Sequence, residues 1–410
     1  MNGTNPAGKL AIDGGTPVRS KPFAPWPVWD EREERMVIEA IRSGKWGGTG
    51  TVLSDGFQEK LPEMETAVAR LQDARYGVSV VNGTVALSVA LHAAGLKPGD
   101  EVIVPPYTFI ATASAPLYTG IIPVFADIEE ETLLLDPVKA EQAITPRTKA
   151  IMPVHIAGAP ADMDRILEVA RRHGLRVIED SAQAIGAQWN GKGVGALGDL
   201  GTFSFQSSKN LNCGEGGVIV TNSEELWERA WSICNVGRVP GGGWYQHDRL
   251  GQNFRMTELQ AALLLAQLTR LEEQMLRREK NAALLDQMLS QVKGIQLIKR
   301  SPSITRHAHH LYMFKLARGA AGTMGKEDFI RKVEAEGIPV SAGYSSLNRN
   351  EAILAETRER AGEARTYSCP VSERLCEQEV VWLPHTVLLS DEEAIQDISR
   401  GIEKVLQSYQ

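Results

Sequence analysis

Short apolar runs alternate with segments of helical spacing over the first half of the chain. The apolar runs cover residues 78–81, 101–105, 121–126, 150–154 and 176–179, and residues 85–94 and 161–173 have the spacing of helices. Strands made mostly of apolar residues are typical of a parallel sheet that helices cover on both faces, because each strand is then buried on both sides. We therefore predict an α/β fold with a mainly parallel central sheet.

Beyond this region the pattern changes twice. Residues 256–288 form a long helical stretch with Leu and Ala on a repeating face, and from residue 294 onward strands and helices are mixed. In that last part, strands are expected at 295–298, 311–316 and 380–383, and helices at 326–336 and 391–406. We predict an N-terminal arm rich in Pro and Gly over 1–30, a large α/β domain that binds the cofactor over 31–255, a linking helix over 256–293, and a smaller α+β domain over 294–410.

The charge and hydropathy of the chain exclude two kinds of partner. Its 410 residues carry a formal net charge of −7 and no Lys/Arg-rich run, which argues against nucleic acid as a partner. No apolar run approaches about 18 residues, the length that spans a membrane. The first six residues are polar and lack the apolar core of a signal peptide. We therefore expect a cytoplasmic protein that does not bind membranes.

Cysteine and histidine are arranged without a metal-binding pattern. The four cysteines lack the paired spacing of a zinc site, and in a chain of this size they indicate reduced thiols. His307 and His309 alternate as on a strand, and no matching carboxylate or cysteine cluster accompanies them. We interpret these histidines as structural and predict no metal.

An acid follows one of these apolar runs, and a lysine follows a further predicted strand. Asp180 comes directly after 176–179, and Lys209 lies in a turn after 203–205. Ligands of such sheets bind beyond the carboxyl ends of the strands. A carboxylate for a pyridinium nitrogen and an amine for an aldehyde are the parts of a pyridoxal phosphate site. We predict that Lys209 binds the cofactor covalently and moves protons, and that Asp180 keeps the ring nitrogen protonated. The ordinary alternatives are a surface lysine and a helix N-cap aspartate.

Further candidates for cofactor binding fall near the same edge. Gly83 and Thr84 open a helix directly after a strand, where free N–H groups and the helix dipole favour a phosphate. Ser204 is a second candidate phosphate ligand, and Gln183 lies one helical turn after the acid, where it can reach the ring hydroxyl. Phe109 offers a flat apolar face to a flat ring. The alternatives are an ordinary turn, a buried serine, an exposed glutamine and a core phenylalanine.

Four motifs together resemble the DegT/StrS-type sugar aminotransferases. They are 180–183 (Asp-Ser-Ala-Gln), 203–205 (Phe-Ser-Phe), the lysine segment with 214–217 (Gly-Glu-Gly-Gly), and 253–256 (Asn-Phe-Arg-Met). The similarity extends from residue 10 to the C-terminal helix. It implies a fold-type-I pyridoxal-phosphate enzyme that is a homodimer with the active site at the subunit interface. It implies the cofactor roles stated above for Lys209, Asp180, Gln183, Phe109, Gly83, Thr84 and Ser204, and it adds Asn253 as a phosphate contact from the second subunit.

The resemblance also indicates a branch of the family. Gln206 stands where the family commonly has a histidine, and 343–348 (Gly-Tyr-Ser-Ser-Leu-Asn) departs from the stretch typical of nucleotide-sugar members. The segments 238–245, 369–371 and 381–385 are more similar to members that act on ketocyclitols such as scyllo-inosose, and to the aminohydroxybenzoate synthases. Tyr344 is then a candidate substrate contact.

These observations lead to one main prediction and several alternatives. We predict a transaminase that moves an amino group from glutamine or glutamate to a cyclic keto-sugar or ketocyclitol, in amino-sugar, aminocyclitol or antibiotic biosynthesis. The alternatives are an aromatising aminohydroxybenzoate synthase-like enzyme and a nucleotide-keto-sugar aminotransferase. Lys209 disfavours a sugar dehydratase of the same fold, since a histidine replaces the lysine in that branch. A non-catalytic regulator is disfavoured because the predicted site is complete.

Overall fold

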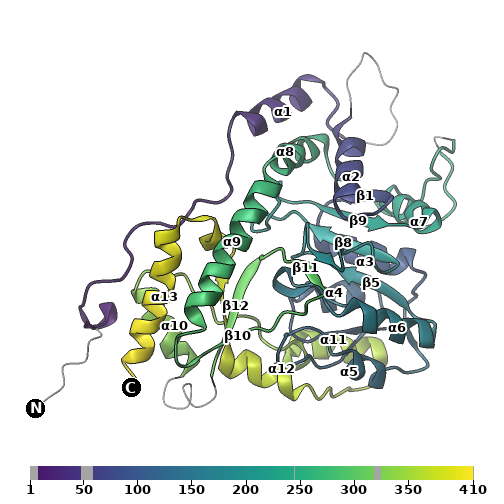
Figure 1. Cartoon of the computed structure of the whole chain (residues 1–410). Helices are drawn as coiled ribbons and strands as arrows, with labels where there is room; N and C mark the ends of the chain where they lie inside the picture. Colours follow the sequence, from purple (N-terminus) through teal and green to yellow (C-terminus); the bar gives the residue numbers. More distant parts are fainter. Residues whose placement is uncertain (1–7, 48–58, 244, 318–324, 410) are drawn as a thin grey trace, which may run out of the picture.

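The computed structural model describes residues 8–47, 59–243, 245–317 and 325–409 (Figure 1). Within these residues the largest sheet has seven strands, in the order β1 (Tyr76–Val80), β9 (Gly217–Thr221), β8 (Leu200–Ser204), β5 (Arg176–Asp180), β4 (Thr148–Ile151), β2 (Glu101–Val104) and β3 (Ile122–Phe125). The strands from β8 to β3 run parallel, whereas β9 is antiparallel to both of its neighbours. The predicted α/β fold with a mainly parallel sheet is confirmed.

Helices cover both faces of this sheet. One face packs against α3 (Gly83–Ala93), α4 (Ala111–Tyr118), α7 (Glu224–Cys234) and α11 (Glu351–Ala361). The other face packs against α5 (Pro137–Gln142) and α6 (Met163–His173), and near β8 and β9 against α2 (Lys60–Leu71) and α8 (Glu258–Leu268). This double cover explains why the strands are apolar along their length. Among the described helices, none is long and apolar enough to cross a membrane.

A second sheet, of three antiparallel strands, belongs to the C-terminal part of the chain. It comprises β10 (Ile295–Leu297), β12 (Leu311–Leu316) and β13 (Val380–Pro384), and it packs with α9 (Leu271–Leu289), α10 (Lys326–Ala335) and α13 (Glu392–Gln407) around its own apolar cluster. A short sheet of β6 (Gln188–Trp189), β7 (Lys192–Gly193) and β11 (Ile304–Arg306) joins the two parts, and α12 (Pro370–Arg374) precedes β13. The strands and helices expected in this region are present, while the domain boundaries stay a prediction.

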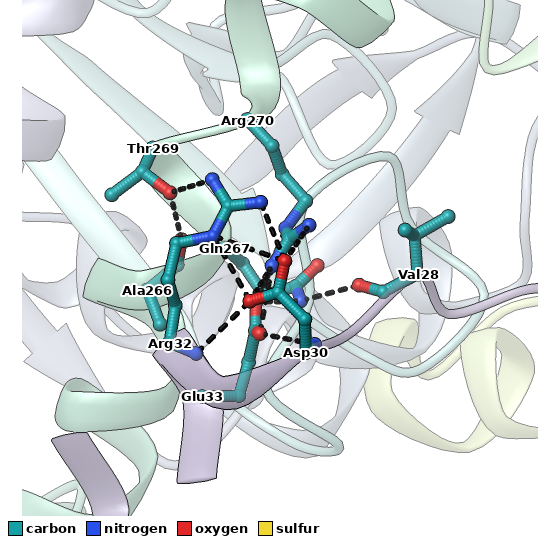
Figure 2. A network of polar contacts seen from close by, with 8 residues as sticks. All are labelled: Val28, Asp30, Arg32, Glu33, Ala266, Gln267, Thr269 and Arg270. Atoms are coloured by element: carbon teal, nitrogen blue, oxygen red, sulfur yellow. Dashed lines mark hydrogen bonds and ion pairs between the residues drawn. The ribbon is translucent and has the colours of Figure 1, made fainter. Parts of the chain in front are cut away.

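The helical stretch expected over 256–288 is divided into α8 and α9, which meet at Thr269 and Arg270. The Thr269 hydroxyl donates back to the Ala266 carbonyl at 2.7 Å. The Arg270 guanidinium reaches the start of α1 (Glu31–Arg42), where it lies 2.7 Å from both carboxylate oxygens of Glu33 (Figure 2). The Leu/Ala face continues through the break, so the periodicity of the sequence does not reveal it.

The N-terminal segment lies along the helices of the C-terminal part (Figure 1). Arg19 forms a buried ion pair with Asp397 at 2.9 Å, and the Ala24 amide donates to the Ser390 hydroxyl at 2.9 Å. The segment ends where Asp30 caps α1. Residues 1–7 of the predicted arm lie outside the described residues.

Candidate active site

Asp180 ends β5 and is buried at the carboxyl edge of the large sheet. Its carboxylate accepts hydrogen bonds from the Thr112 hydroxyl at 2.8 Å and from the Ala182 amide at 3.2 Å. Because the Thr112 proton is directed to Asp180, Thr108 donates across the 2.9 Å contact between the two threonine hydroxyls. Burial raises the pKa of Asp180, and these hydrogen bonds and the charge of Lys209 oppose that rise. Two donors leave this carboxylate with capacity to bind a cation.

Glu179, the neighbouring acid on β5, is saturated by hydrogen bonds. It is fully buried and accepts bonds of 2.6–2.9 Å from three backbone amides and one imidazole, those of Gly195, Leu197, Gly198 and His155. The His155 Nδ1 accepts from the Ala161 amide, so its Nε2 carries the proton that is donated to Glu179. Glu179 therefore stabilises the loop after β5 and has no free acceptor capacity comparable to that of Asp180.

Lys209 lies in the loop between β8 and β9. Its backbone amide donates to the Gln206 carbonyl at 2.8 Å. In the described part of the chain, no hydrogen bond or ion pair of the Lys209 Nζ is found. Burial lowers the pKa of Lys209 to about 8, and the charge of Asp180 opposes this shift. A substantial fraction of the amine is therefore neutral near physiological pH, and the neutral amine is the form that attacks an aldehyde.

The start of α3 and the end of β8 form the anion-binding side of the site. A Cβ built on Gly83 would lie 2.7 Å from the Cβ of Ser204, so the close approach of these two elements requires glycine. The Asn82 side chain accepts from the Val85 amide at 2.9 Å and caps the helix. The amides of Gly83 and Thr84 have no intrahelical acceptor, and together with the Ser204 hydroxyl they suit a phosphate.

Gln183 and Tyr344 are held together beside Asp180. The Gln183 Oε1 accepts from the Ala157 amide at 2.7 Å, and its Nε2 donates to the Tyr344 hydroxyl at 2.7 Å. The Tyr344 ring packs edge-on against Trp382, with 4.6 Å between ring centres. Burial raises the pKa of Tyr344 to about 12, so its hydroxyl keeps its proton at neutral pH and can donate it to a ligand.

Phe109 and Asn253 are exposed residues in this structure. Phe109 precedes α4, and its side chain is 56% exposed, which leaves an apolar ring free to cover a flat ligand. The Asn253 side chain accepts from the Arg255 amide at 3.4 Å. The predicted roles of these two residues, in stacking and in a contact from a second subunit, stay predictions.

This cluster fits pyridoxal phosphate. The cofactor has an aldehyde, a pyridinium nitrogen and a phosphate, and the described residues provide an unpartnered amine, a buried acid and a helix N-terminus for them. The sequence prediction missed Thr112 and His155, which hold the two acids of β5. Thr112 is one of two hydroxyl residues in a run of small residues, 111–115, and nothing in the sequence distinguishes it from Ser114. An isolated histidine such as His155 has no distinctive spacing.

The histidines near β12 do not form a metal site in this structure. The rings of His307 and His309 stack with 4.1 Å between their centres, and the His309 amide donates to the His307 Nδ1 at 2.8 Å. Burial lowers the pKa of both histidines well below the usual value. Over the described residues, no group of three His, Cys, Asp or Glu side chains is arranged to hold a metal ion.

Known proteins resemble the chain over nearly its whole length. The model of the DegT/DnrJ/EryC1/StrS aminotransferase family matches residues 28–402. Two relatives from Micromonospora echinospora are each 38% identical: a putative L-glutamine:3-amino-2,3-dideoxy-scyllo-inosose aminotransferase, with 97% of both chains covered, and an L-glutamine:2-deoxy-scyllo-inosose aminotransferase, with 98% of both chains covered.

Solved structures show the same likeness. The structure of 3-amino-5-hydroxybenzoic acid synthase has a TM-score of 0.84 and 32% identity, and the alignment covers 94% of this chain and 99% of that one. The structure of NtdA from Bacillus subtilis with bound cofactor PMP has a TM-score of 0.80 and 29% identity, covering 92% of this chain and 81% of that one.

Proposed function

Because the chain belongs to the DegT/DnrJ/EryC1/StrS aminotransferase family and is a pyridoxal-phosphate-dependent aminotransferase of fold type I, we propose that it transfers the amino group of L-glutamine to a cyclic polyhydroxy ketone related to scyllo-inosose. The observation that carries this proposal is 38% identity, over 98% of both chains, to a protein named for that reaction. The family, the class of activity and the cofactor predicted from the sequence are confirmed.

The residues at the carboxyl edge of the large sheet have different roles in this reaction. When bound, the cofactor supplies an aldehyde that takes up the amino group and a ring that withdraws electrons. Lys209 would supply the neutral amine that holds the aldehyde, and the same amine is placed to move a proton at the substrate carbon. Asp180, oriented by Thr112, keeps the ring nitrogen protonated. The phosphate is bound by Gly83, Thr84 and Ser204.

The acceptor ketone is placed on the side of the site that faces the C-terminal part of the chain. Tyr344 is half-buried and has a protonated hydroxyl that Gln183 fixes in position, which suits it to donate to a substrate oxygen. Gln183 keeps a second amide proton for the ring hydroxyl of the cofactor. In this proposal Phe109 would cover the ring of the cofactor, and Asn253 would hold the phosphate in a second copy of a cytoplasmic homodimer.

A second candidate function is supported by the likeness to 3-amino-5-hydroxybenzoic acid synthase, with its TM-score of 0.84. In that case the enzyme would convert a cyclic ketone to an aromatic product. The two functions differ in the ultraviolet spectrum of the product, since an aromatic ring absorbs in the near ultraviolet and an aminocyclitol does not.

The spectrum of the purified protein with pyridoxal phosphate tests the proposal. We expect a band of lysine-bound cofactor near about 420 nm, which L-glutamine converts to a band near roughly 330 nm. Adding 2-deoxy-scyllo-inosose should restore the first band and yield the amine. Lys209→Ala should lack the first band and the conversion, whereas Lys192→Ala, at an exposed position in β7, should behave as the wild type. A Lys209→Ala protein that turns over at the wild-type rate would refute the role of Lys209.

A further inference from the structure

Arg278 on α9 is a buried cation for which the described part of the chain provides no carboxylate partner. The residue is 0% exposed, and its guanidinium has one hydrogen-bond partner among the described residues, the His385 Nδ1, at 3.1 Å. The guanidinium also lies 5.4 Å from the centre of the Trp26 ring. Its Nε and Nη1 are buried without an acceptor. Burial of an unpaired cation costs stability. We therefore expect Arg278 to have a role other than stabilising the fold.

The Arg278 contact determines which nitrogen of His385 carries the proton. A guanidinium can donate but cannot accept, so the His385 Nδ1 must be the acceptor. The Nε2 of His385 therefore carries the proton, and it donates to the Ser208 carbonyl at 3.0 Å. Burial and the charge of Arg278 lower the pKa of His385 well below its usual value. The ring therefore stays neutral, and it can accept from Arg278 and donate to the Ser208 carbonyl at the same time. The chain of contacts ends one residue before Lys209.

Residues on both sides of Lys209 are held in similar ways. We call residues 206–211 the lysine loop. The Trp26 indole N–H donates to the Ser207 carbonyl at 2.8 Å, and the Trp26 ring packs edge-on against His385 with 4.6 Å between ring centres. On the other side, the Asn210 side chain donates through its Nδ2 to the Ala308 carbonyl at 2.6 Å. The loop is thus tied to segments far away in the sequence, through the carbonyls of Ser207 and Ser208 and the side chain of Asn210, while the Lys209 amine has no hydrogen bond to the described residues.

We propose that Arg278 is a positioning residue for Lys209: by fixing the acceptor nitrogen of His385, it holds the Ser208 carbonyl and so fixes the loop that presents the lysine to the cofactor. The proposal rests on the role of Lys209 in the proposed function. Arg278 does not touch the reacting atoms, because its guanidinium is enclosed beneath His385 and Trp26.

Hydrogen–deuterium exchange of the cofactor-free protein tests this proposal. The amides of Ser208 and Lys209 are hydrogen-bonded within the loop, so their exchange reports its opening. We expect Arg278→Met to accelerate this exchange about tenfold or more. Arg277→Met, at the exposed neighbouring position of α9, should leave it unchanged. In the loaded enzyme, Arg278→Met should lower kcat for the glutamine half-reaction and leave KM unchanged, because the loop presents the lysine and not the donor.

Two variants of His385 keep the test decisive if Arg278→Met does not fold. His385→Gln retains an acceptor and a donor, whereas His385→Leu has neither. We expect exchange in the lysine loop to stay within about threefold of the wild type in the first variant and to rise about tenfold in the second. Equal exchange in these two variants, or in Arg278→Met and Arg277→Met, would overturn the proposal. Failure of the proposed function is distinguishable, since an active Lys209→Ala protein would leave the exchange results untouched.

Discussion

Helix α9 begins directly after one buried arginine and contains a second, and the surroundings of the two differ. Arg270, at its start, contacts both carboxylate oxygens of Glu33 at 2.7 Å and Asp30 at 3.1 Å (Figure 2). Arg278, two turns later, meets the neutral ring of His385. The first arginine joins α1 to the α8–α9 junction by matched charges. The second remains an unmatched charge next to the lysine loop.

The difference separates parts of the molecule that hold the fold from parts that serve the reaction. We call Asp30, Glu33 and Arg270 the α1–α9 corner, where each buried charge has a partner. The acids of β5 show the same contrast, since Glu179 has four donors and Asp180 has two. A saturated group stabilises the native state and cannot bind anything else, whereas an unsaturated group costs stability and is available to a ligand.

Asp180→Asn should produce the largest effect on the reaction. The amide keeps the size of the side chain but cannot hold the ring nitrogen protonated, so we expect turnover to fall about 10³-fold. Thermal unfolding of the cofactor-free protein should change little, because removing a buried charge with few partners costs little. Steady-state kinetics and calorimetry on the same samples check both parts. A strongly destabilised variant would show that Asp180 stabilises the fold as Glu179 does, and would contradict the contrast drawn between the two acids.

Glu33→Ala should lower the stability of the protein and leave its turnover unchanged. It leaves Arg270 buried without its main partner, and we expect the free energy of unfolding to fall by about 3–5 kcal/mol. Glu34→Ala, at an exposed position of the same helix, should change it by less than about 0.5 kcal/mol. Chemical denaturation measures both values. Equal stability of the two variants would show that the α1–α9 corner contributes nothing.

Thr112→Val tests whether Thr112 orients the carboxylate of Asp180. The variant removes the hydrogen bond to Asp180, which spans 2.8 Å, and we expect kcat to fall about tenfold. Thr112→Ser retains a hydroxyl and should restore most of the activity. Stopped-flow rates of the glutamine half-reaction distinguish the two, and identical rates would exclude an orienting role for Thr112.

The smallest expected effect is the pH dependence of the free lysine. Burial lowers the pKa of Lys209 to about 8, so its neutral fraction in the cofactor-free protein should rise about fivefold between pH 7 and 8 and then level off. Lys299 is exposed beside Glu131, which raises its pKa, so its labelling should keep rising about tenfold per pH unit. Acetylation at several pH values, followed by peptide mass spectrometry, measures both. Parallel profiles would contradict the lowered pKa.

Local patterns in the sequence predicted most of the fold. The parallel strands and the elements of the C-terminal sheet were predicted because apolar periodicity depends on neighbouring residues. Strand β9 was missed because it follows β8 through the lysine loop and not through a helix, so it falls outside the alternation of strands and helices. In the structure the charge of Asp180 opposes the lowering of the Lys209 pKa by burial, and Gly83 lies next to Ser204, as a shared sheet edge predicts. The roles of these residues stay predictions.

The sequence by itself determined the class of fold, the acid at the end of β5 and the lysine in the loop after β8, since these depend on periodicity and on residue type. Only the tertiary structure decided which of the two adjacent acids is saturated, where the long helical stretch divides, and which cation is left without a carboxylate. Those outcomes depend on partners far apart in the chain: Thr112 and Asp180 are 68 residues apart, and Arg278 and His385 are 107 apart. Burial and hydrogen bonding set the energy of a charge, and both arise when distant segments pack together.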